Sequence, residues 1–148
     1  MSLPLFTDTT FEKKDFRDTP LEKGEYENCK YSKCILSGTD CSSILFIDCT
    51  FFGSDLSLVN LAKTCFRDVT FKDCYLHEAD FTESDLTAAI FDHCDLARAT
   101  FDHTILEKAD FRTAVNYSID PENNKIKKAR FSVAGIAGLL DKYDIDID

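Results

Sequence analysis

The fold is decided by residues 71–111, which read FKDCY LHEAD FTESD LTAAI FDHCD LARAT FDHTI LEKAD F. Every fifth residue of this stretch is Phe or Leu. The same period extends back to Phe6, and 21 of the 22 positions from Phe6 to Phe111 are Phe, Leu or Tyr, with Cys41 the exception. Helices repeat about every 3.6 residues and strands about every 2, so a period of 5 indicates a coil in which each pentapeptide forms one side.

A second inward position lies two residues before each large one. There, 19 of 22 residues are Ala, Cys, Ser, Thr, Val or Gly. Four such pentapeptides close a roughly square coil of about 20 residues, and successive coils stack about 4.8 Å apart. The coil length has independent support, because it stacks like on like along two neighbouring sides: Phe11, Tyr31, Phe51, Phe71, Phe91 and Phe111 on one, and Phe16, Leu36, Leu56, Leu76 and Leu96 on the next.

The seven cysteines follow the same period. Cys41 occupies a large position, and no pair has the C-x2-C spacing of a structural zinc site. The sequence therefore predicts core filler rather than a metal centre. Pairs 20 residues apart would lie on adjacent coils at a distance compatible with a disulfide, whereas the odd count favours free thiols. Five cysteines belong to the small position: Cys29, Cys34, Cys49, Cys74 and Cys94.

The chain resembles the pentapeptide repeat proteins, whose repeats read roughly A-[DN]-[LF]-x-x. The clearest matches are Ala79-Asp80-Phe81, Ser84-Asp85-Leu86, Cys94-Asp95-Leu96 and Ala109-Asp110-Phe111. The resemblance covers residues 6–114 and is specific because it is periodic. It implies an all-β solenoid, namely a right-handed quadrilateral β-helix of pentapeptide repeats.

The ends of the chain differ from its middle. We expect a pentapeptide-repeat β-helix over residues 1–131, regular over 6–114, with a modified last coil over 115–131. The pattern is lost after Asn116, yet Ala129 and Phe131 return in register. Residues 132–148 are then a capping and dimerisation segment, a short C-terminal α-helix with Ser132 as N-cap, followed by an acidic tail.

An apolar stripe on this helix is expected to cover the open end of the solenoid. Gly135 and Gly138 would allow close approach of another chain. The resemblance extends to the C-terminal ends of bacterial pentapeptide repeat proteins, including the quinolone-resistance group, and implies a homodimer through this end. The candidate cap and dimer residues are Val133, Ile136, Ala137, Leu140 and Tyr143.

Composition excludes several functions. The 27 acidic and 17 basic side chains give a net charge of -10, which argues against direct binding to nucleic acid or an anionic membrane. There is no run of 18 apolar residues, and residues 1–6 lack the basic start and long apolar stretch of a secretory signal. The expected compartment is the cytosol, and the expected partner is a protein.

No catalytic or cofactor site is predicted. His77, His93 and His103 all follow a large residue and point outward, where a convex face offers no cleft. G-x-S-x-G, P-loop and metal-ligand spacings are missing from the sequence. We therefore expect a non-enzymatic protein with no cofactor and no metal.

Acidity is concentrated in residues 40–97, which hold 11 acidic and 3 basic side chains, net -8. These 58 residues make about three coils, so the band carries roughly one net charge per 1.8 Å, close to the ~1.7 Å of duplex DNA. The resemblance points the same way, because some family members are regarded as DNA mimics that bind type II topoisomerases and protect gyrase from quinolones. Candidate contacts on two adjacent faces are Asp40, Asp55, Asp80, Glu83 and Asp95.

Two observations favour a different function. Asp before a large residue also braces turns, so it is expected whatever the protein binds. The quinolone-resistance group carries a projecting loop, whereas Phe6 to Phe111 runs here without an inserted residue.

The first prediction is therefore a protein-binding or structural module with an apolar contact patch. The alternative is an acidic DNA mimic that binds DNA gyrase or topoisomerase IV. The candidate patch residues are Leu45, Ile47 and Phe52.

Overall fold

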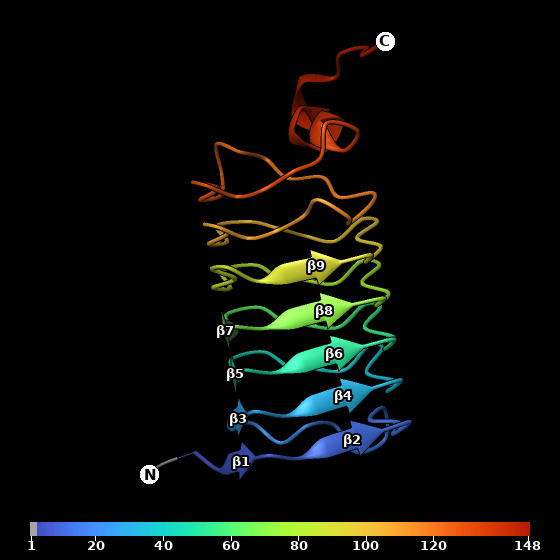
Figure 1. Cartoon of the computed structure of the whole chain (residues 1–148), viewed down its shortest axis with the longest axis vertical. Coiled ribbons are helices and arrows are strands. Elements are labelled where there is room, and N and C mark those ends of the chain that lie inside the picture. The colour runs from blue at the N-terminus through green and yellow to red at the C-terminus, as the bar shows by residue number, and fades with distance from the viewer. Residues whose placement is uncertain (1–2) are drawn as a thin grey trace.

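The computed structural model describes residues 3–148. Met1 and Ser2 lie outside the described residues. They are the first residues of the expected repeat domain and of the segment 1–6 in which no secretory signal was predicted. The chain is a right-handed quadrilateral β-helix whose coils stack along one axis from the N-terminus to the C-terminus (Figure 1). The fold class predicted from the five-residue period is confirmed.

Nine short strands form two parallel sheets, in the orders β1-β3-β5-β7 and β2-β4-β6-β8-β9. Their partners are 20 residues apart, as in Phe6↔Tyr26 and Phe71↔Phe91. The strand bounds are β1 Leu5–Thr7, β2 Thr10–Glu12, β3 Glu25–Glu27, β4 Lys30–Ser32, β5 Leu45–Ile47, β6 Thr50–Phe52, β7 Cys65–Arg67, β8 Thr70–Lys72 and β9 Ile90–Asp92.

The four sides of the coil are named faces A to D in chain order. Face A holds β1 and its sheet, and face B holds β2 and its sheet. Faces C and D are joined through isolated parallel bridges in the same 20-residue register. The bridge between Asp110 and Arg130 carries that register into the last coil.

None of the nine strands has Asp or Asn before its large residue. All nine strands are centred on Phe or Tyr. Where Asp or Asn comes before the large residue, its side chain accepts the backbone N–H two residues later: Ser42 donates to Asp40 at 2.9 Å, and Ala62 donates to Asn60 at 3.0 Å. The same brace is made by Asp15, Asp55, Asp80, Asp85, Asp95, Asp110 and Asp120.

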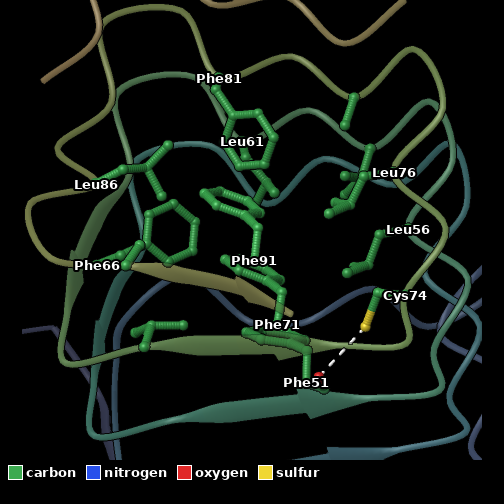
Figure 2. Packing of buried hydrophobic residues seen from close by; sticks show 14 of the residues in the cluster. Phe51, Leu56, Leu61, Phe66, Phe71, Cys74, Leu76, Phe81, Leu86 and Phe91 are labelled. Carbon is green, nitrogen blue, oxygen red and sulfur yellow. Dashed lines mark hydrogen bonds between the residues drawn. The ribbon is translucent and has the colours of Figure 1, made fainter. Parts of the chain in front are cut away.

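The core is a set of columns along the axis. On face B, seven rings from Phe11 to Phe131 stack with centroid separations of 4.6 to 5.4 Å, which confirms the predicted aromatic ladder and extends it by one ring. Phe51, Phe71 and Phe91 follow one another in Figure 2, beside the leucine column of face C. Each ring gains offset stacking in addition to its burial.

The small inward position does more than fill space. The Cys94 thiol donates to the Phe71 carbonyl at 3.2 Å, and the Cys74 thiol donates to the Phe51 carbonyl at 3.3 Å (Figure 2). Ser54 makes the equivalent bond to Tyr31. All seven cysteines are free, and burial raises the pKa of Cys49 to about 12, so its thiol stays protonated and unreactive.

The predicted C-terminal α-helix is wrong. The segment forms two 3-10 turns, η1 (Ile136–Leu139) and η2 (Asp141–Tyr143). In an α-helix the Gly138 carbonyl would accept the backbone N–H of the residue four positions later. Here it accepts the Ile119 N–H at 3.0 Å instead. Gly135 and Gly138 also lie directly against Tyr117, which leaves no room for a Cβ at either position.

The cap is nevertheless docked on the last coil. Ser132 Oγ accepts the Gly135 N–H at 3.0 Å, but the N-cap of η1 is Gly135, so Ser132 is not the predicted helix N-cap. Lys142 pairs with Asp120 at 3.0 Å and with Glu122 at 2.9 Å. The side chain that packs against the core is Leu139, which the predicted stripe does not include.

Each regular corner places the second residue after the large one in the left-handed region. Ser43 has φ 59° and an exposed side chain with no hydrogen bond, whereas Ser57, one position earlier in its pentapeptide, is outside that region. We expect Ser43→Gly to raise the free energy of unfolding by about 0.5–1 kcal/mol, because Gly adopts this φ without strain. The matched change Ser57→Gly should lower it. Chemical denaturation measures both, and a destabilised Ser43→Gly protein would contradict the expectation.

Candidate protein-binding surfaces

The five predicted acidic contacts come together on faces C and D. Asp40 and Asp80 share one column of face D with Asn60 between them, and Asp55 and Asp95 share one column of face C. Glu83 lies at the corner that follows Asp80. Within each column the two carboxylates are two coils apart, about 9.6 Å.

Three of the five carboxylates lie beside a basic or imidazole side chain of the same chain. Lys23 pairs with Asp40 at 3.1 Å, and His77 lies 2.8 Å from Asp95. Glu83 pairs with Lys63 at 3.9 Å. Hydrogen bonds from Ser42, supported by Lys23, lower the pKa of Asp40 to about 2, so its charge is fixed at neutral pH but already has a partner. Within residues 3–148, only Asp55 and Asp80 of the five make no ion pair.

Face C also carries exposed apolar side chains. Tyr75 and Leu58 are each 59 % exposed. Tyr75 stands in the column between Asp55 and Asp95, where the repeat usually has a turn-bracing Asp or Asn. Sequence reasoning did not single out Tyr75, although a ring at an outward position of this column was the available signal.

The predicted apolar patch lies on one coil at the corner between faces A and B. Leu45 and Ile47 of β5 are half-buried, and Phe52 of β6 is 37 % exposed. Phe52 stands in register between Ser32 and Lys72. The three predicted residues are thus neighbours along the chain, and Phe52 offers the largest free surface among them.

A charge pattern at the same corner was missed by the sequence reasoning. The second residue after the large one on face A is Asp48, then Asp68, and two coils later Lys108 and Lys128, all exposed. None of these four makes an ion pair within residues 3–148. The signal was in the sequence, but the predicted acidic contacts were chosen from faces C and D, and this column was not compared at intervals of 20.

The three histidines lie on three different faces. Each sits beside one carboxylate: His77 beside Asp95, His93 beside Asp92 and His103 beside Asp102. Among the described residues, no group of three or more His, Cys, Asp or Glu side chains is placed to hold a metal ion. From residue 3 onward, no helix has the length and apolarity of a bilayer span.

A hollow of about 710 Å³ lies between the last coil and the cap. Val115, Tyr117, Ala137 and Gly138 are among its lining residues. From the predicted dimer stripe, Val133 is 92 % exposed and Ile136 is 51 % exposed. These two apolar side chains of the cap therefore face solvent, whereas Leu139 packs against the core.

These coils define a class, the pentapeptide-repeat solenoids. Comparison with known families matches residues 24–101 to the pentapeptide repeat region. The match covers more than half of the chain, so the protein belongs to the pentapeptide repeat family. None of the curated proteins matches its sequence.

Solved structures with similar architecture include QnrB1, a plasmid-mediated fluoroquinolone resistance protein, with 16% identity, TM-score 0.43, and 98% of this chain and 100% of that chain covered. A pentapeptide repeat protein of the Arabidopsis thaliana thylakoid lumen has 23% identity and TM-score 0.42, covering 64% and 59%. HetL, from the cyanobacterium Nostoc and involved in the regulation of heterocyst differentiation, has 11% identity and TM-score 0.39, covering 90% and 86%.

Proposed function

We propose that this protein is a non-enzymatic, cytosolic binding module that recognises another protein through the outer surface of its solenoid. The observation that carries the proposal is the exposure of Tyr75 and Leu58 on face C, between the carboxylates of Asp55 and Asp95. Tyrosine is enriched at the energetic centres of protein interfaces, and charged neighbours form the rim of such sites. The exposed Phe52 ring, with Leu45 and Ile47, provides a second surface of the same kind.

Neighbouring coils supply variants that the fold already accepts. Asn60 occupies on face D the position that Tyr75 has on face C, and Ser32 occupies the position of Phe52 one coil earlier. We expect Tyr75→Asn and Phe52→Ser to keep the thermal midpoint of the wild type and to weaken partner binding by about tenfold each.

The partner would be captured from a lysate of the source cells and then titrated against the purified variants. Thr100→Ser on face D is the matched surface control. A partner that binds both variants with wild-type affinity would remove these surfaces from the proposal.

The second candidate function is an acidic DNA mimic that binds DNA gyrase or topoisomerase IV. Asn60 supports it, because Asn braces the turn as well as Asp does. The fold therefore does not require the negative charges of Asp40, Asp55, Asp80 and Asp95. Solubility or recognition of a partner would account for these charges. The resemblance to the quinolone-resistance group is the reason why DNA gyrase and topoisomerase IV are proposed as the targets of such a mimic.

A quadruple Asp→Asn variant at positions 40, 55, 80 and 95 tests the mimic. Each Asn keeps the Oδ1 acceptor of the turn brace while the side chain loses its charge, so the variant should fold. We expect wild-type protein at micromolar concentration to inhibit supercoiling by gyrase or decatenation by topoisomerase IV, and the variant to lose that effect. Assays run with and without a quinolone in which the wild type neither inhibits nor protects would refute the mimic.

We also propose a homodimer through the C-terminus. Val133 and Ile136 are exposed beside the hollow that Ala137 lines, and Leu140 and Tyr143 belong to the same cap. Two caps related by a two-fold axis would bury these side chains against each other.

The change Val133→Asp, at a side chain that makes little contact within its own chain, should convert this dimer to a monomer without lowering the thermal midpoint. Sedimentation velocity measures the change. Ser118→Asp, at an exposed position of the last coil, is the control for added charge. A Val133→Asp protein that sediments as the wild type does would contradict a cap dimer.

A further inference from the structure

The corner between faces A and B carries a column in which charge reverses sign. Its members are 20 residues apart, are all exposed and have φ between 52° and 61°, so their side chains leave the corner in the same way. The column begins with Asp8 and Asn28, which hydrogen-bond to each other at 2.7 Å. From the third coil on, two acids come before a small apolar residue and two bases follow it: Asp48, Asp68, Ala88, Lys108 and Lys128.

The adjacent column, one residue earlier in each pentapeptide, reverses in the opposite sense. Arg67 precedes the middle residue Thr87, and Glu107 follows it, whereas the next positions outward, Ile47 and Lys127, are not of opposite charge. At the same middle level on face B, Ile90 is 41 % exposed. The corner is thus apolar at its centre, and three of its four pairs of equidistant positions carry complementary charges.

The six charged residues that form complementary pairs about the centre have no partner within their own chain. None of Asp48, Arg67, Asp68, Glu107, Lys108 and Lys128 makes an ion pair or a side-chain hydrogen bond within residues 3–148. On faces C and D several charges are paired across coils, as in Lys23 with Asp40 and Arg98 with Glu78, although Asp55 and Asp80 are not. The charges of the corner are exposed and available to a second chain.

We propose that this corner is a self-complementary interface through which two copies of the chain pack side by side with their solenoid axes antiparallel. A two-fold axis at the level of Ala88, perpendicular to the solenoid axis, places each column opposite its own copy and inverts the order of the coils. Asp68 then faces Lys108 of the second copy, Asp48 faces Lys128, and Arg67 faces Glu107. Symmetry doubles each pair, which makes six.

The shape of the corner agrees with this arrangement. A groove of about 360 Å³ lies in its basic half, with Ala88 and Ile90 in the lining and Lys108, Lys128 and Arg130 around them. The acidic half of the second copy lies over this groove. Asp110 also lines it, but Arg112 pairs with Asp110 at 2.9 Å, so that carboxylate is already neutralised.

The centre of the interface joins Ala88 and Ile90 to their own copies. Asp85, the one acid at this level of face A, turns its Oδ1 to the Thr87 hydroxyl and N–H and is half-buried. Exposed ion pairs contribute about 0–1 kcal/mol each and are screened beyond about 8 Å at physiological salt. The association is therefore weak, and it weakens further as salt is added. It is also separate from the cap, because it uses the side of the solenoid and not its end.

Charge reversal in two complementary variants tests the proposal. Lys108→Glu with Lys128→Glu makes the column of Asp48 and Asp68 acidic throughout, and Asp48→Lys with Asp68→Lys makes the same column basic throughout. Each variant alone should self-associate at least about tenfold more weakly than the wild type, because four of the six pairs across the axis become repulsive and only the two between Arg67 and Glu107 stay attractive. An equimolar mixture of the two should associate at least as tightly as the wild type. Sedimentation velocity at low salt, in a Val133→Asp background that removes a cap dimer, measures all three samples.

The matched control is Lys13→Glu with Lys33→Glu, which changes two exposed lysines of the corresponding column on face B, with φ 54° at both. This control should associate as the wild type does. Recovery in the mixture shows that both variants are folded. The proposal is overturned if the wild type stays monomeric at low salt, if the acidic variant associates as the wild type does, or if the mixture shows no gain. Binding of a labelled poly-glutamate peptide by a monomeric wild type would assign the basic half to a different, acidic ligand.

Discussion

The structure depends on the stacking of each large residue on the one 20 positions later. Seven rings on face B and the leucines of face C hold successive coils in register, and the backbone hydrogen bonds between coils follow that register. Because each coil contacts only its neighbours, stability accumulates coil by coil. Every outward position inherits the same register, so the surface consists of columns whose composition can be read at intervals of 20.

The columns could be predicted because period 5 is incompatible with any ordinary helix or strand. The hydrogen bonds made by the small inward residues could not be predicted. The pattern shows that Cys94 is small and inward, but it does not show that the Cys94 thiol reaches the carbonyl of Phe71. The cap failed for a related reason. The apolar stripe of a helix is present in the cap sequence. However, the Gly138 carbonyl accepts a hydrogen bond from Ile119 of the last coil, and this bond replaces the one that an α-helix would make.

Charge was the property that the sequence described least well. Counting residues 40–97 gave an acidic band, but the net charge that a partner meets depends on which side chains are already paired. Lys23 lies outside that range in the sequence and still pairs with Asp40, because it comes one coil earlier on the same face. Conversely, the sequence pattern did not single out Asp48 and Asp68, yet both are exposed and make no ion pair within residues 3–148.

A scaffold whose surface is arranged in independent columns separates stability from recognition. Replacing Asp by Asn before a large residue leaves the turn brace intact, and corner residues in the left-handed region such as Asp48 and Lys108 are exposed and make no ion pair within residues 3–148. Charge can therefore change along one column without disturbing the core or the next column. On faces C and D several charges are paired within the chain, as in Lys23 with Asp40, whereas the six complementary charges between faces A and B reverse sign about a centre and stay unpaired within residues 3–148. The fold requires neither arrangement, because the turn brace and the core are the same in both.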